Sequence, residues 1–534
     1  MRRRICVSMA LLLCALLIGG TAFASLDGTI TRQYYGSNMT QLPIVGPNDP
    51  PVTLTVWSDL NSTVMDDMNQ CAVYPELEKR TGVKIKWEYP PTGQATENFT
   101  LRISTGDLPD MFMNAPDYPG GLEKGVADQV LLPINSYYDK GLTPNYKYLR
   151  DKYPEIAMNT VTDSGMMVEW NDLDYVPSSP WSGLWVRKDW LDAQGLQVPV
   201  TLKDWDTMLR KFKDAYGAVL GLNIKDWYGV RTNFAFSAAY DTGYDWINKD
   251  GVVEYGPASA GYKEFLTLLH GWYADGLYDP DFATRTYESY NANVSNGVYG
   301  AFGQAYGDTG PTIVAGKAKD PNFQVLAVRQ PVAYDGQVIK LRQTDSIVRW
   351  NHDFLTYQCV TDGVDEIAMK WKDYWYSQEG GDLFSYGPEG VSYQWDANDH
   401  LQWIYNDTGV VPAAYKDLDF WTVLPLFKVH VAGYLRDSTS YKNVPEVWQC
   451  IDEWAKDNPV YYYPDWVSLT TEEDQERSAI EVNMQTYREE MTYKFITGQE
   501  SLDNFDNYVE ELKGMGLDDC TAIKQAGLDR YLAR

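Results

Sequence analysis

Aromatic and polar side chains recur in this sequence at places where strands are expected to end. Trp57 is followed by Asp59 and Asn61, and Asn114 and Asp117 follow a later apolar run. A flat indole can cover the apolar face of a ring-shaped ligand, while carboxylates and amides satisfy its rim of hydroxyl groups. Ligands of open α/β sheets lie beyond the carboxyl ends of the strands. These residues therefore predict a non-covalent binding site for a sugar-like molecule.

Further candidates for this site come from later segments of the chain. In chain order they are Trp181, Trp185, Arg187, Trp246, Phe302, Tyr386, Glu389, Tyr393 and Trp395. Trp181 and Trp185 flank a glycine, so we expect one ring to face the ligand and the other to pack inside the fold. The last four surround a glycine turn, and we expect this loop to line the site because its side chains are large and partly polar.

Several candidates have a structural alternative of similar weight. Trp57 could be a core residue, because large rings dominate the buried area of any big domain. Asp59 and Asn61 could lie in a solvated loop. Arg187 could form an ion pair with Asp189 instead of binding hydroxyl groups.

The sequence contains none of the common motifs for catalysis or metal binding. The four histidines form no His-Glu-x-x-His pattern, and the sequence has no Gly-x-Ser-x-Gly elbow, phosphate-binding glycine loop or EF-hand spacing. We therefore expect no catalytic residues, no metal and no cofactor. Cys71, Cys359, Cys450 and Cys520 form no Cys-x-x-Cys pair; they could make up to two disulfides, in any of three pairings, or remain free thiols.

The composition narrows the choice of partners and compartment. A net charge of -29 argues against nucleic acid, whose phosphates require Lys and Arg. Residues 2–4 are arginines, residues 5–20 are mostly apolar, and Ala22-Phe23-Ala24 supplies a small-x-small cleavage pattern. We interpret residues 1–24 as a signal peptide, with an uncleaved anchor as the alternative. Leu13 is too large for a lipoprotein signal, which makes lipidation of Cys14 the lesser hypothesis.

Strands that alternate with helices must position these residues. Residues 25–51 lack periodicity and are predicted to be a linker. Strands are expected at 52–57, 83–89, 110–113, 184–186 and 298–302, and helices at 64–80, 97–105, 188–191, 202–216 and 259–274. This order predicts βαβ units with mainly parallel sheets. Thr470 and Glu473 fit a capping box, and apolar residues from Ile480 to Phe495 mark one helical face that ends at Gly498.

Ordered blocks along residues 52–530 resemble one protein family. They include Glu76 to Ile85, Ile103 to Asp110, Trp185 to Leu191, Asp250 to Gly256, Tyr386 to Tyr393 and Phe495 to Gly498. These blocks look like the family 1 extracellular solute-binding proteins of carbohydrate ABC transporters, in particular the LplA-like and alginate-binding subset. Some alginate-binding relatives carry a calcium loop, whose ligands are not found here.

The resemblance implies a two-lobed periplasmic-binding-protein-like α/β fold. Each lobe is expected to be a mainly parallel sheet flanked by helices, with hinge crossings between the lobes. The expected division is 52–180 plus 345–385 for lobe 1, 181–344 plus 386–465 for lobe 2, and 466–534 for a helical region that packs on both.

The function that the resemblance implies is capture of an oligosaccharide between closing lobes, followed by delivery to ABC permease subunits. We expect an exported monomer at the cell surface, in the periplasm or outside the cell. The alternatives are an exported glycoside hydrolase, a glycan-binding surface protein without transport, and a receptor for a peptide or another polar solute.

Overall fold

A computed structural model describes residues 32, 34, 36, 38–59, 66–173, 180–224, 233–344, 346–349, 352–404 and 445–534. The predicted signal peptide, Cys14 and Asn61 lie outside these residues. Within them, no helix combines the length and the apolar character that crossing a membrane requires.

The first sheet forms near the amino-terminal end of the described chain. Its strands are β1 (Val52–Ser58), β2 (Val83–Glu88), β3 (Met111–Ala115) and β12 (His352–Leu355). Their order is β12-β3-β1-β2, with β1 parallel to both of its neighbours and β12 antiparallel to β3. Leu54 and Val56 are buried beneath the sheet's helices. A strand more than 230 residues away thus completes this sheet, so the chain must leave the first body and return to it.

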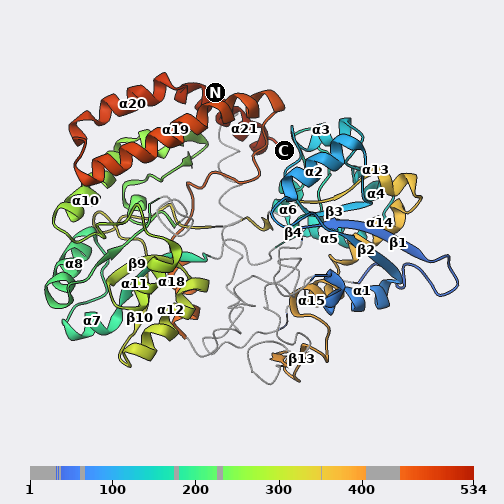
Figure 1. Cartoon of the computed structure of the whole chain (residues 1–534), viewed down its shortest axis with the longest axis horizontal. Helices are drawn as coiled ribbons and strands as arrows, with labels where there is room; N and C mark the ends of the chain where they lie inside the picture. Colours follow the sequence, from blue (N-terminus) through green and yellow to red (C-terminus); the bar gives the residue numbers. More distant parts are fainter. Residues whose placement is uncertain are drawn as a thin grey trace, which may run out of the picture.

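Short helices surround the first sheet (Figure 1). They are α1 (Val73–Thr81), α2 (Ala95–Thr105), α3 (Leu122–Ala127), α4 (Asn135–Asp139), α5 (Pro144–Lys152), α6 (Pro154–Asn159), α13 (Tyr357–Thr361), α14 (Asp365–Tyr374) and α15 (Gln378–Tyr386). The helix predicted at 64–80 begins late, because Asp67 caps the separate 3-10 turn η1 (Met68–Gln70). It ends as expected at Gly82, whose φ of 72° suits glycine.

The second sheet differs from the prediction. Its strands are β5 (Ser182–Arg187), β6 (Val219–Gly221), β9 (Tyr299–Ala305) and β10 (Val325–Val328), in the order β10-β5-β9-β6. Only the β6–β9 pair is parallel, so among the described strands this sheet is mainly antiparallel. The helix between β9 and β10 does make those two strands parallel, but β5 inserts between them in the opposite direction. A fully buried strand such as β5 carries no pattern that reveals its direction.

Helices and a hairpin complete the second body. They are α7 (Lys188–Ala193), α8 (Leu202–Tyr216), α10 (Ala260–Ala274), α11 (Tyr287–Ser295), α12 (Tyr306–Lys319) and α18 (Pro445–Trp454), with the hairpin β7 (Trp246–Lys249) and β8 (Val252–Tyr255) and the 3-10 turns η2 (Ser237–Tyr240) and η3 (Gly256–Ala258). Helix α8 has the predicted bounds, because Thr201 and Asp204 form a capping box at its start and Gly217 ends it.

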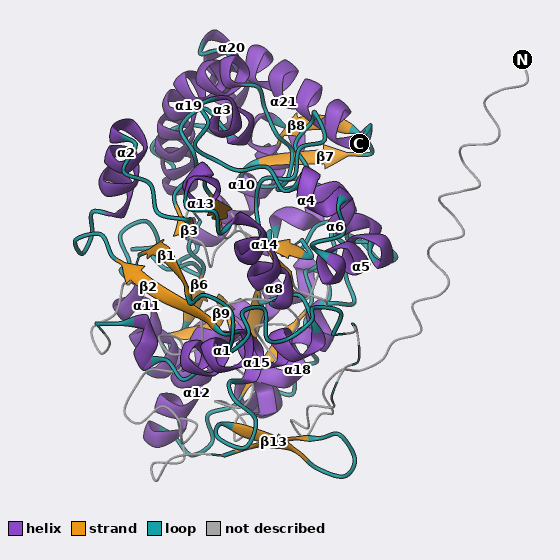
Figure 2. Ribbon diagram, turned by 90° about the vertical axis from the view of Figure 1, so that its right-hand side faces the viewer, coloured by secondary structure: helices purple, strands orange, loops and turns teal. Residues whose placement is uncertain are grey.

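Three carboxyl-terminal helices lie over the second body. Helix α19 (Thr471–Thr497) packs on α10, and α21 (Leu517–Leu532) packs on β8 and α19; η5 (Leu502–Asn504) and α20 (Phe505–Gly514) connect them. The end of α21 reaches the first body near α3 (Figure 1). Figure 2 shows the same helices beside β7 and β8, far from the small hairpin of β13 (Tyr393–Trp395) and β14 (Leu401–Trp403).

The segments that join the two bodies are bonded to each other. Strands β4 (Asp172–Leu173) and β11 (Val348–Arg349) are antiparallel partners. The indole Nε1 of Trp466, on a third segment, donates to the Val348 carbonyl over 2.9 Å. These three segments meet at one place, as expected for the hinge of a two-body fold.

Candidate functional site

A cleft of about 910 Å³ lies beside these joining segments. From the first body it is lined by the loop after β3, the start of α3 and residues 159–171. From the other side it is lined by residues 463–471, the first turns of α19, and Lys524, Arg530 and Arg534. The cleft therefore lies between the first body and the carboxyl-terminal helices, beyond the carboxyl end of β3.

His352 joins two carboxylates at the wall formed by the first body. Its Nε2 lies 3.0 Å from Asp117 Oδ1, and its Nδ1 lies 2.7 Å from Glu169 Oε1. Burial would lower the pKa of His352, but the hydrogen bonds to both carboxylates outweigh it and raise the pKa to about 10. The ring is therefore an imidazolium at neutral pH, and the hydrogen bond from His352 lowers the pKa of Asp117.

The fold explains how these three residues meet. His352 pairs with Ala115 in the sheet, just before the loop that carries Asp117. Glu169 forms a bridge with Phe354 on the other side of β12. Asn171 donates to Glu169 Oε2 over 2.8 Å, which fixes the second carboxylate oxygen.

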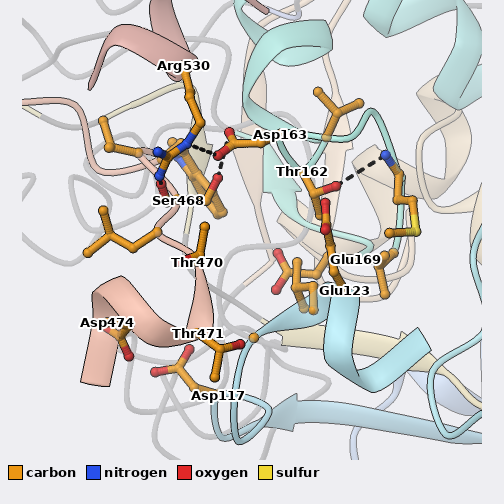
Figure 3. Close-up of a pocket in the computed structure, with 18 of the residues that line it drawn as sticks. Asp117, Glu123, Thr162, Asp163, Glu169, Ser468, Thr470, Thr471, Asp474 and Arg530 are labelled. Carbon is orange, nitrogen blue, oxygen red and sulfur yellow. Dashed lines mark hydrogen bonds and ion pairs between the residues drawn. The ribbon is translucent and has the colours of Figure 1, made fainter. Parts of the chain in front are cut away.

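Hydrogen bonds join the opposite wall to the first body at two places. Asp163 accepts hydrogen bonds from Arg530 Nε over 2.9 Å and from Ser468 Oγ over 3.0 Å (Figure 3). Thr471 Oγ1 donates to the Gly120 carbonyl over 2.9 Å. Burial would raise the pKa of Asp163, but hydrogen bonds from arginine side chains and Ser468 outweigh it and lower the pKa.

Every cation that lines the described cleft has an acidic partner. The pairs are Lys124 with Asp128, Arg477 with Asp474 and Glu481, Lys524 with Glu481, Arg530 with Asp163 and Glu473, and Arg534 with Asp163. The cleft is also lined by the partly buried rings of Tyr463 and Trp466. Rings combined with hydroxyl, amide and carboxylate groups suit a ligand with apolar faces and many hydroxyl groups.

The structure brings one predicted site residue, Asp117, into the described part of this cleft. Trp57, Trp185 and Phe302 are instead fully buried. Trp57 packs against aromatic rings and donates Nε1 to Asn98 Oδ1. Trp185 and Phe302 stack inside the second body. Because both faces of such rings are covered, they are core residues here.

Arg187 and Trp246 also have structural partners. Arg187 forms two hydrogen bonds with Asp189, of 2.9 and 2.6 Å, and lies between two aromatic rings. This is the ion pair that was the alternative to ligand binding. Trp246 is 9% exposed and donates Nε1 to Glu481 Oε1 over 2.8 Å.

The remaining predicted residues lie apart from the cleft. Tyr386 and Tyr393 are buried and form an aromatic cluster with the partly buried Trp395, while Glu389 is exposed. These four residues lie close together around the glycine turn that they flank, and not at the cleft. The other three are the exposed Asn114 and the partly buried Asp59 and Trp181.

Sequence patterns did not identify most of the residues that form the cleft. Glu169, His352 and Trp466 carry no motif, since their proximity comes from pairing between distant segments. Thr470, at one edge of the cleft, was identified only as part of a helix capping box and not as a site residue. Asp117 was found because it follows a strand.

Acidic, histidine and cysteine side chains elsewhere in the described chain are arranged as follows. Within the described chain, no group of three or more His, Cys, Asp or Glu residues is arranged to hold a metal ion. Cys71, Cys359, Cys450 and Cys520 are all buried, and no disulfide joins them to one another in this structure. Burial raises the pKa of Cys71 to about 12, so its thiol is not a nucleophile at neutral pH.

Known proteins resemble this chain in sequence. The sequence model of a family described as bacterial extracellular solute-binding proteins matches residues 68–381. The fructooligosaccharide ABC transporter substrate-binding protein FusA of Streptococcus pneumoniae is 25% identical over 510 residues, which cover 88% of each chain. Lipoprotein LipO of Bacillus subtilis is 24% identical over 313 residues, covering 55% of this chain and 54% of LipO.

Solved structures resemble it in fold. FusA in complex with kestose matches with a TM-score of 0.68 and 23% identity, covering 90% of this chain and 99% of FusA. A solute-binding protein described as binding HMO, from Bifidobacterium longum infantis, matches with a TM-score of 0.71 and 19% identity over the same shares. These likenesses confirm the two-lobed solute-binding fold.

Proposed function

The chain belongs to the family of bacterial extracellular solute-binding proteins, and from this premise we propose that it is the substrate-binding protein of an ABC importer. It captures an oligosaccharide between its lobes and presents it to the permease subunits. The match to FusA over most of both chains supports this substrate class.

The observation that carries the proposal is the position of the polar cleft at the joining segments. Closure of a two-lobed protein changes the distance between the two walls of such a cleft. A ligand that contacts both walls therefore favours one arrangement of the lobes. Asp117 comes from one wall of the cleft, and Tyr463 and Trp466 come from the other.

We propose that the protein is not a glycoside hydrolase. A hydrolase requires a carboxylic acid that stays protonated to donate to the leaving group. Three of the acidic side chains that line the cleft, Asp117, Glu123 and Asp163, have lowered pKa values, because hydrogen bonds to these carboxylates outweigh the burial that would raise them. Such carboxylates accept hydrogen bonds from hydroxyl groups and do not supply protons.

The proposal also concerns the compartment and the division of the chain. The protein acts outside the cytoplasm, at a place that the signal peptide alone does not specify. The lobes are residues 52–180 plus 345–385 and 181–344 plus 386–465, with 466–534 as the helical region. Residues 38–50 belong with lobe 1, because Thr40 donates to Asp373 there.

A binding experiment tests the proposal. Neutral and acidic oligosaccharides are screened by thermal shift, and hits are measured by calorimetry, product analysis and small-angle scattering. A ligand at about one hundred times its Kd raises the free energy of unfolding by about 2.7 kcal/mol. We expect intact ligand and a more compact scattering profile; cleaved ligand, or a screen without any stabilising glycan, contradicts the proposal.

A further inference from the structure

The wall of the cleft that carries Asp117 has an unusual construction for a ligand site. Asp117 is 92% exposed at its side chain, whereas Glu169 and His352 are 8% and 25% exposed. One carboxylate therefore extends into the cleft. The partly buried ring of His352 holds it from behind, and the buried carboxylate of Glu169 holds that ring. The His352 ring also stacks on Phe354 at an interplanar angle of 12°, which fixes its orientation.

The same wall contains a buried amide oxygen without a described donor. Asn171 lines the cleft and is 1% exposed, yet its Oδ1 has no hydrogen-bond partner among the described residues. Its amide nitrogen is engaged by Glu169. A buried acceptor without a donor is costly.

The charges of the cleft decide what kind of ligand fits. Its cations are held by protein carboxylates, as in the pair of Arg530 with Asp163 at 2.9 Å. An anionic ligand would have to break such a pair, and it would meet the exposed carboxylate of Asp117. A hydroxyl group instead donates to a carboxylate in a charge-assisted hydrogen bond, which is stronger than a neutral one.

We infer that Asp117, held by His352 and Glu169, is the ligand-binding acceptor that restricts this cleft to uncharged, hydroxyl-rich glycans. Asp117 contacts the ligand, whereas His352 is a positioning residue that acts through Asp117. This inference rests on the proposed function, since it names the substrate class of the same cleft. It excludes uronate and sulfated glycans as the transported solute.

A printed array of neutral, uronate-containing and sulfated oligosaccharides tests the substrate class. We expect neutral glycans to bind and their acidic counterparts of equal length to bind at least about tenfold more weakly, because an unpaired charge facing a carboxylate is unfavourable. Acidic glycans bound as tightly as neutral ones would overturn the inference and leave the proposed function intact. If no glycan on the array bound, the result would contradict both the proposed function and this inference.

Substitutions test the named residues with the tightest-binding glycan of the array. Asp117→Asn is expected to weaken binding of a neutral glycan by about tenfold or more. It should also reduce the difference in affinity between neutral and acidic glycans. Asp151→Asn, on an exposed pair with Lys147, changes the charge equally and should have no effect. Unchanged affinity in D117N would contradict the assignment of Asp117.

His352 requires a measurement that does not depend on the ligand. Nitrogen-15 NMR of the histidine rings in the ligand-free protein should show His352 as an imidazolium with both ring nitrogens protonated at pH 7. His352→Gln should weaken glycan binding while Asp117 remains, and H352Q together with D117N should be no weaker than D117N alone. A neutral His352 ring, or additive losses in the double variant, would overturn its positioning role.

Discussion

At the scale of single residues, tryptophan in this protein is used chiefly for the core. Trp57, Trp170, Trp185, Trp205, Trp371 and Trp375 rank among the largest fully buried side chains. The sequence pattern selected several aromatic side chains as site candidates but could not separate buried rings from exposed ones. Burial depends on what the other segments place over each ring, which no local pattern contains.

Replacement of Trp57 with alanine tests its assignment to the core. Trp57→Ala leaves a cavity beside Phe99 and Phe112 and should lower the free energy of unfolding by about 3–5 kcal/mol. Urea denaturation measures this change. Leu101→Ala is the control, because Leu101 is 58% exposed, and it should change stability by less than about 0.5 kcal/mol. A stable W57A protein that has lost glycan binding would instead assign Trp57 to the ligand.

The raised pKa of His352 gives the protein a defined dependence of stability on pH. The folded pKa is about 10 against an ordinary value of 6.5, so the folded state retains a proton that the unfolded state releases. The stabilising contribution is complete below pH 6.5 and is lost as the pH rises through 10. It amounts to a few kcal/mol, since each unit of pKa shift corresponds to about 1.4 kcal/mol.

The variant His352→Gln should therefore be less stable than the parent protein at pH 6, with the difference shrinking toward pH 10. Urea midpoints across this range measure it. The matched control is His270→Gln, because His270 Nδ1 contacts only a backbone carbonyl, that of Ile496, among its described partners. A difference in stability that does not vary with pH would show that His352 acts through packing alone.

At the scale of elements, local signals predicted helices better than they predicted the site. Helix α19 was predicted from Thr470, Glu473 and its apolar face, and the structure confirms the capping box and the end at Gly498. Caps and periodicity are properties of neighbouring residues. The cleft instead combines residues 117–124, 159–171, 463–477 and 524–534, and its geometry depends on long-range packing.

The segment before β1 illustrates the same limit. Residues 38–50 resemble a linker in composition, yet buried Asp373 on α14 binds this segment to the first lobe. Asp373 accepts hydrogen bonds from Thr40 Oγ1, from the Asn145 and Tyr146 backbone and from the Asn145 side chain, at 2.8 to 3.2 Å. A polar sequence can thus be ordered when buried acceptors of the adjoining lobe, here Asp373 and the Thr81 carbonyl, accept hydrogen bonds from it.

Asp373→Ala should lower the free energy of unfolding by about 3 kcal/mol or more, because several buried donors lose their acceptor at once. Limited proteolysis should also cleave the segment of residues 38–50 faster in this variant. The surface change Asp151→Ala serves as the control, since Asp151 is 61% exposed at its side chain. Equal stability and equal cleavage rates in D373A would show that other contacts retain the segment.

At the scale of the whole molecule, function depends on how the two lobes and the helical region are held relative to each other. Helix α21 packs on the second lobe, while its last turns are bonded to the first. Tyr531 donates to Asn159 Oδ1 over 2.8 Å, and Arg534 bonds Asp163 over 2.7 Å. One helix therefore spans the cleft, and its ion pairs contribute to the arrangement seen here.

Asp163→Ala tests whether these bonds set that arrangement. The variant removes the common acceptor of Arg530, Arg534 and Ser468, and partly buried ion pairs of this kind are worth about 1 kcal/mol each. We expect the radius of gyration of the ligand-free protein to increase, because α21 loses its strongest bonds to the first lobe.

High salt should also increase the radius of gyration of the parent protein, since partly exposed ion pairs are screened. The Thr471 hydrogen bond to Gly120 carries no net charge, so it should persist in salt and limit the change. Scattering curves of D163A that match those of the parent protein at every salt concentration would show that apolar packing at the joining segments alone fixes the position of the lobes.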